Sequence, residues 1–115
     1  MTRRSDKGLG RSNEPTVLIL TSLAAGAKHG YALSKDIEEF AGVALGPGTL
    51  YGAIARLDER GLIEPVGEDE RRRPYRITLA GRRALADAVQ EMHALADVGA
   101  SRLGVALPTA GAWAR

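Results

Sequence analysis

The segment from residue 48 to residue 79 constrains the fold of this chain more than any other part. Its pattern predicts a helix that ends at Gly61, then a short apolar strand, a charged turn and a second strand. Leu50, Ile54 and Leu57 recur at helical spacing, which predicts one buried stripe along the helix. Gly61 suits the left-handed residue that commonly ends a helix. A helix that leads directly into a hairpin is therefore the central unit of the chain.

The other side of this predicted helix is small and polar. It carries Thr49, Gly52, Ala53 and Arg56. Small side chains near the start of a helix permit a close approach to the major groove of DNA. Helical periodicity is equally typical of an amphipathic core helix whose outer face has no function, so the helix by itself leaves both interpretations open.

The predicted hairpin has a strongly charged tip. Its strands begin at Leu62 and at Tyr75, and three acidic residues followed by three arginines lie between them. The arginines are Arg71, Arg72 and Arg73. An isolated charge run is usually a solvated turn, but this run lies where a winged helix-turn-helix would meet DNA. It therefore predicts guanidinium contacts to phosphates or to a minor groove. Pro74 lacks a backbone donor, which predicts that its strand is an edge strand.

Two further helices precede this unit. The first, over residues 14–25, is apolar on most sides and is expected to be buried. The second, over residues 31–40, directs Ile37 and Phe40 inward, whereas Lys35 faces outward and is expected to hold a phosphate. The predicted fold class is therefore mainly α with a small β-hairpin wing, that is, a winged helix-turn-helix with a C-terminal helix.

Several short motifs occur along the chain in a definite order, over about residues 15 to 85. They are His29-Gly30-Tyr31-Ala32-Leu33, Gly48-Thr49-Leu50-Tyr51, Arg56-Leu57, Gly61-Leu62-Ile63, and Arg73-Pro74-Tyr75-Arg76-Ile77-Thr78 followed by Gly81. Each motif is weak alone, but the ordered set is specific. In this order and spacing the chain resembles the PadR family of transcriptional regulators.

The resemblance implies a DNA-binding domain, a C-terminal dimerisation helix and repression from a pseudo-palindromic operator. It also implies release by a small molecule, for which an aromatic or drug-like compound is expected. By matching positions, Thr49 and Tyr51 open the recognition helix, and residues 71–75 lie on the wing; Pro74 departs from many relatives, which have a free N–H there. The residues expected to contact double-stranded DNA are Lys35, Thr49, Tyr51, Arg56, Arg71, Arg72, Arg73 and Tyr75.

The chain divides into four predicted parts. Residues 1–13 are expected to form a disordered basic arm, and residues 14–79 form the DNA-binding domain. Residues 80–98 form the dimerisation helix, and residues 99–115 form a flexible tail. Trp113 lies beyond the predicted helix, and the sequence assigns it no role.

An apolar seam runs along the predicted C-terminal helix at spacings of three and four residues. It consists of Leu85, Val89, Met92 and Leu95. One helix cannot bury such a seam alone, so a two-fold homodimer is expected. Packing of the seam against the first helix of the same chain is the alternative.

Composition excludes several other functions. The 115 residues include no cysteine, so a disulfide framework, a thiol nucleophile and a Cys-ligated zinc site are all excluded. His29 and His93 are the only histidines, and no catalytic set or metal-binding interval can be assembled around them. We therefore expect no cofactor, no metal and no enzymatic activity.

Charge and hydropathy agree with a DNA-binding role. The net charge is only +2, yet 13 of the 16 basic residues are arginine, which favours a localised patch for phosphates. No apolar run reaches the ~20 residues that a membrane span needs. The basic start of the chain lacks the apolar stretch of a secretory signal. A cytoplasmic protein is expected.

A second class of function fits the same pattern. A winged-helix module could bind protein partners through the wing and the seam, without specific affinity for DNA. Such a module predicts dimerisation with no DNA binding at physiological salt.

Replacement of Arg72 by alanine tests whether the wing touches DNA. We expect Arg72→Ala to weaken binding to duplex DNA and to reduce the slope of log K against log[salt] by about 0.9, because one phosphate contact is lost. Fluorescence anisotropy titrations at several salt concentrations measure this slope. An unchanged slope would contradict contact between the wing and DNA.

Overall fold

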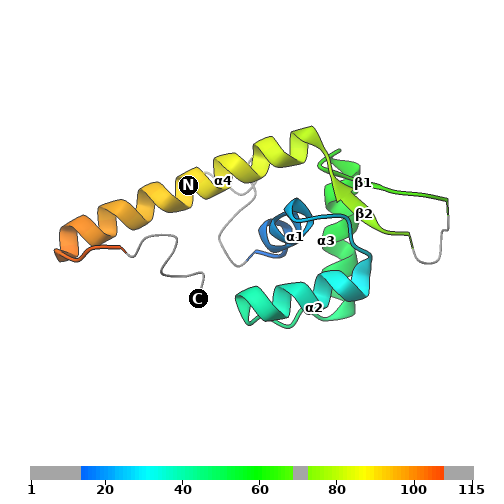
Figure 1. Cartoon of the computed structure of the whole chain (residues 1–115), viewed down its shortest axis with the longest axis horizontal. Helices are drawn as coiled ribbons and strands as arrows, with labels where there is room; N and C mark the ends of the chain where they lie inside the picture. The colour runs from blue at the N-terminus through cyan, green and yellow to red at the C-terminus, as the bar shows by residue number, and fades with distance from the viewer. Residues whose placement is uncertain (1–13, 69–72, 108–115) are drawn as a thin grey trace.

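The computed structural model describes residues 14–68 and 73–107 (Figure 1). Its elements are α1 (Pro15–Ala24), α2 (Gly30–Ala41), α3 (Pro47–Glu59), β1 (Ile63–Pro65), β2 (Tyr75–Ile77) and α4 (Leu79–Leu103). The predicted fold, mainly helical with a two-stranded hairpin and a C-terminal helix, is confirmed. The expectations for residues 1–13, Arg71, Arg72 and Trp113 concern residues outside the described ranges.

Helix α1 lies at the centre of the molecule. Its side chains are apolar on nearly every side, so the helix is stable only when other elements enclose it. Ile19 and Leu20 are fully buried, and Leu23 is 1% exposed. Helices α2, α3 and α4 and strand β2 all pack against α1. The prediction that this helix is buried is confirmed, and the chain's own elements provide the cover.

Helices α2 and α3 bury narrow stripes against α1, and two details differ from the expectation. Ala53 was expected on the outer face of α3 but is fully buried, because the stripe of Leu50 and Leu57 is wide enough to include it. Phe40 was expected to face inward but is 46% exposed. The buried side of α2 ends one turn earlier, at Ile37.

The hairpin is fixed on both sides of β2. Strand β1 pairs with it in antiparallel register, with Ile63 opposite Ile77, and both of these side chains are buried at the base of the wing. On the other side, Tyr75 exchanges two backbone hydrogen bonds with Lys28, of 3.1 and 2.9 Å. In the two-stranded sheet β2 is an edge strand, as predicted, and Lys28 pairs with its outer side only at Tyr75. Pro74 is tolerated because it precedes β2, and its carbonyl still accepts a 2.8 Å hydrogen bond from the Val66 N–H.

A compact joint connects α3, the hairpin and α4. Helix α3 ends before Gly61, whose φ of 76° confirms the predicted left-handed residue. The Thr78 hydroxyl donates to the Gly61 carbonyl at 2.7 Å and accepts from the Gly81 N–H at 3.0 Å, so it also caps α4. A β-carbon at Gly81 would lie 2.8 Å from the Ile77 side chain and closer still to the Leu62 carbonyl oxygen. The joint therefore requires glycine at this position.

Helix α4 is longer than predicted. It continues to Leu103, so the boundaries of 80–98 for the helix and 99–115 for the tail are wrong over residues 99–103. Gly99 does not end the helix, since one internal glycine costs only about 1 kcal/mol relative to alanine. The helix ends instead at Gly104, where φ is 73° and the Val105 N–H donates to the Ala100 carbonyl at 2.9 Å.

Candidate nucleic-acid interface

The outer face of α3 carries unusually small residues from Gly48 to Ala55. Opposite the buried stripe lie Gly48, Gly52 and Ala55, of which Gly48 and Ala55 are exposed and Gly52 is partly exposed. Larger exposed residues flank this narrow strip: Thr49 and Arg56 on one side and Tyr51 on the other. The backbone of α3 can therefore approach a partner surface closely, while side chains on both edges remain free to reach it.

The charges on α3 are unevenly distributed along the helix axis. No acidic residue occupies the first turn, whereas Asp58 and Glu59 lie in the last one. The first turn therefore carries the positive end of the helix dipole without a carboxylate of its own. The Arg56 guanidinium lies back along the helix, since a β-carbon at Gly52 would be 3.6 Å from its Nη1. This arrangement favours a polyanion at the N-terminal half of α3.

Tyr51 connects the start of α3 with the start of α2. Its side chain is 54% exposed, and its ring lies directly over Gly30, the first residue of α2. Tyr51 therefore occupies the junction of the two helices. The sequence motifs contained both residues but gave no indication that they touch, because the contact depends on how α2 and α3 cross.

Helix α2 presents a second predicted contact. Lys35 is exposed on the side of α2 away from the buried Leu33 and Ile37. Its ammonium is thus available to a phosphate strand that runs across α2. Tyr31, 72% exposed, lies one turn earlier on the same helix.

The described part of the wing has a packed base and a charged outer surface. Tyr75 is partly buried against the core, so its ring anchors the wing in addition to any contact that it makes outside. Arg76 donates to Glu64 across the two strands at 2.7 Å, and both side chains are well exposed. Arg73 is partly exposed just before β2. Arg71 and Arg72, predicted at the tip, lie outside the described residues.

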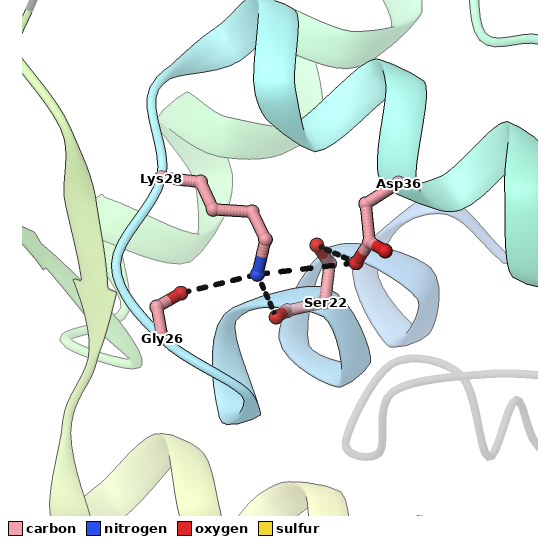
Figure 2. Close-up of polar contacts among 4 residues, drawn as sticks. All are labelled: Ser22, Gly26, Lys28 and Asp36. Atoms are coloured by element: carbon pink, nitrogen blue, oxygen red, sulfur yellow. Dashed lines mark hydrogen bonds and ion pairs between the residues drawn. The ribbon is translucent and has the colours of Figure 1, made fainter.

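A cluster of polar groups lies between the end of α1 and α2, and Figure 2 shows its geometry. The Lys28 ammonium donates to the backbone carbonyls of Ser22 at 2.6 Å and Gly26 at 3.3 Å, and it lies 3.9 Å from the Asp36 carboxylate. The hydroxyl of Ser22, a residue only 1% exposed, donates to the same carboxylate at 2.6 Å. The cluster joins the end of α1 to the middle of α2.

The backbone of Lys28 extends this connection to the wing. Its N–H and carbonyl pair with Tyr75, while its side chain holds α1 and α2. Lys28 thus links α1, α2 and the wing, so these three elements keep fixed relative positions. Nothing in the local sequence indicates that the charge of Lys28 is used internally.

The four residues of the predicted dimerisation seam differ in their burial. Leu85 and Met92 are partly buried against the core of their own chain, as in the alternative interpretation. Val89 is 49% exposed and Leu95 is 74% exposed. Beyond them, Val98 and Leu103 are 47% and 78% exposed on the distal half of α4. In Figure 1 this half extends past the other described helices.

In the described ranges, every helix is too short or too polar to cross a bilayer. On α4, the His93 imidazole lies 3.4 Å from the Asp97 carboxylate, one turn along the same helix. Within the same ranges, no three potential metal ligands come together.

This arrangement of helices and hairpin defines a winged helix-turn-helix regulator. The family model of the PadR-like transcriptional regulators matches residues 19–87, which include α2, α3, the wing and the proximal part of α4. The chain belongs to this PadR-like family, as the sequence motifs predicted.

Solved structures agree with this assignment. A PadR family transcription regulator from Clostridium difficile is 26% identical, with a TM-score of 0.70; the match covers 79% of this chain and 99% of the other. A PadR family transcriptional regulator from Eggerthella lenta is 30% identical, with a TM-score of 0.65, and the match covers 76% and 80%.

A protein of a mobile genetic element is also similar. The uncharacterised 37.1 kDa protein of transposon Tn4556 from Streptomyces fradiae is 42% identical over 98 residues, or 85% of this chain. The chain spans only 28% of the length of that protein.

Replacement of Lys28 by methionine tests the polar cluster. Lys28→Met keeps the aliphatic stem but removes the donor to the Ser22 carbonyl, so we expect a loss of about 1 kcal/mol in the free energy of unfolding. Urea unfolding followed by circular dichroism measures this loss. Lys35→Met is the matched control on the exposed side of α2, and its stability should stay within about 0.5 kcal/mol of the wild type. Equal stability of the two variants would contradict the connecting role of Lys28.

Proposed function

We propose that the protein is a sequence-specific DNA-binding transcriptional repressor that acts as a homodimer on a pseudo-palindromic operator. The observation that carries the proposal is the outer face of α3, a narrow strip of small residues with Thr49, Arg56 and Tyr51 at its edges. Membership of the PadR-like family of transcriptional regulators supports it.

In the proposed complex, α3 enters the major groove with its N-terminal half. The small residues Gly48 and Gly52 allow the helix backbone to approach the base edges, while Thr49, Tyr51 and Arg56 contact bases or adjacent phosphates. Arginine suits both roles because its planar guanidinium can form two parallel hydrogen bonds with guanine or phosphate.

Positioning in this complex comes from groups outside α3. Lys35 holds a phosphate from α2, and Arg73 contributes positive charge at the wing. The sequence-based prediction adds Arg71 and Arg72 at the wing tip. Phosphate contacts of this kind carry little sequence information, but they fix the orientation of the recognition helix.

The partner proposed for the distal half of α4 is a second copy of this chain. Leu95, Val98 and Leu103 are all at least 47% exposed, although the same helix buries Ala88 against its own core. A two-fold axis through the distal halves would let each copy cover the apolar residues of the other. It would also place two α3 helices to meet successive major grooves, roughly 34 Å apart.

Release from DNA by a small aromatic or drug-like molecule completes the proposal. This element comes from the resemblance to the PadR family, as does the choice of repressor over activator. A cytoplasmic location fits a protein that must reach DNA.

Selection from a random pool of DNA duplexes, followed by fluorescence anisotropy, tests this function. We expect the protein to enrich a sequence with two related halves and to bind it at least ~10³-fold more tightly than a scrambled duplex of equal length. Equally weak binding to both duplexes would contradict the proposal. Dimerisation without DNA binding would instead favour the protein-interaction module.

Replacement of Leu95 by glutamate tests the dimer. Because Leu95 is 74% exposed, Leu95→Glu should leave the fold intact but raise the dissociation constant of the dimer at least ~10-fold, as expected for a loss of 1.4 kcal/mol or more. Sedimentation equilibrium measures this constant. Ala86→Glu adds the same charge at an exposed position on the side of α4 opposite Leu95 and should leave the constant unchanged. An unaffected dimer in Leu95→Glu would exclude this face as the interface.

A further inference from the structure

The contact between Gly30 and Tyr51 leaves no room for a side chain at the start of α2. A β-carbon built on Gly30 would lie 2.8 Å from Cζ and 3.0 Å from Cε1 of Tyr51, and closer still to its hydroxyl oxygen. Such separations are far below ordinary van der Waals contact, so one of the two groups would have to move. Gly30 is itself buried, and the Tyr51 ring provides part of that cover.

The backbone of Gly30 does not require glycine. Five described glycines have a positive φ, and Gly30 is not among them, since it begins α2 in an ordinary helical turn. An alanine would fit this backbone, and the atoms that it meets most closely all belong to the Tyr51 side chain. The glycine is thus needed for the position of the tyrosine ring and for no conformational reason of its own.

Gly81 provides the contrast. A β-carbon there would collide with the Leu62 backbone carbonyl and with the Ile77 side chain at 2.8 Å. Neither can move without disturbing the joint between the wing and α4. The Tyr51 phenol, in contrast, is the far end of a side chain that is 54% exposed, and it can swing outward into solvent. Replacement of Gly81 by alanine should therefore disturb the fold. Replacement of Gly30 by alanine should change only the direction of the Tyr51 side chain.

We infer that Gly30 is a positioning residue for DNA recognition, which acts by allowing the Tyr51 ring to lie on the first turn of α2. The inference rests on the proposed function, in which Tyr51 meets bases or nearby phosphates at the start of α3. With the ring against Gly30, the phenol has a defined direction relative to both helices. If the ring did not rest against Gly30, the Tyr51 side chain would be mobile in the free protein. It would then lose its rotamer freedom when the protein binds DNA, and this loss lowers the affinity.

A double-mutant cycle on DNA binding tests the inference. The proteins are the wild type, Gly30→Ala, Tyr51→Ala and the double variant, and the probes are the duplex selected by the wild type and its scrambled counterpart. We expect Gly30→Ala to lower affinity for the selected duplex about fivefold, equivalent to about 1 kcal/mol, with little change for the scrambled duplex. In the Tyr51→Ala background, Gly30→Ala should have no further effect, because the residue acts through the tyrosine.

Two measurements on the free protein separate positioning from stability. The thermal midpoint of Gly30→Ala should remain close to that of the wild type, whereas Gly81→Ala should lower it. In protein labelled with 3-fluorotyrosine, the ¹⁹F resonance that disappears in Tyr51→Phe should shift in Gly30→Ala. A large loss of thermal stability in Gly30→Ala would overturn the inference, because it would make the glycine a structural residue.

The outcomes distinguish this inference from the function on which it rests. If the wild type selects no sequence, the proposed function fails. If the wild type selects a sequence and Gly30→Ala binds it equally well, only the inference fails. Equal losses from Gly30→Ala with and without Tyr51 would also overturn it, since the two residues would then act independently.

Discussion

The enclosure of α1 is the constraint on which the rest of the structure depends. A helix with apolar residues on nearly every side must be surrounded, and Ile19, Leu20 and Leu23 are accordingly removed from solvent. Three helices and strand β2 share this task. Each of them is left with one outward surface. The outer strip of α3, the exposed side of α2 and the wing are therefore available to a ligand because α1 occupies the other sides.

These surfaces are useful together only if their relative positions are fixed. The Lys28 backbone pairs with Tyr75 of the wing, and the Lys28 side chain holds the end of α1 beside Asp36 of α2. At the other end of β2, Thr78 holds the end of α3 and the start of α4. Hydrogen bonds thus fix both ends of β2 to the surrounding helices. Binding to an extended polyanion then requires little ordering of α2, α3 and the wing, and this preorganisation preserves affinity.

The sequence predicted what local periodicity and glycine chemistry determine. Leu50, Ile54 and Leu57 gave the buried stripe of α3, and Gly61 gave its end, because both depend on residues close in the chain. Long-range geometry was not predictable in this way. Ala53 is buried because other elements cover a wider arc of α3 than its largest side chains indicate. The Gly30–Tyr51 contact and the double pairing of β2 depend on how distant segments meet. Whether the exposed site residues touch DNA is a property of the complex and stays a prediction.

The length of α4 has a mechanical consequence for the proposed regulator. Its proximal half packs against α1, with Ala88 buried, and its distal half carries the exposed Leu95 and Leu103. The helix is continuous between them, and Gly99 is its only internal glycine beyond Gly81. In a dimer joined through the distal halves of α4, each DNA-binding domain would lie at the proximal end of a stiff α4 helix. That end of α4 is anchored on α1. A small change in the angle between the two α4 helices would alter the separation of the two α3 helices. That separation must match the spacing of successive major grooves, so an effector bound between the distal halves could control DNA binding without altering either α3.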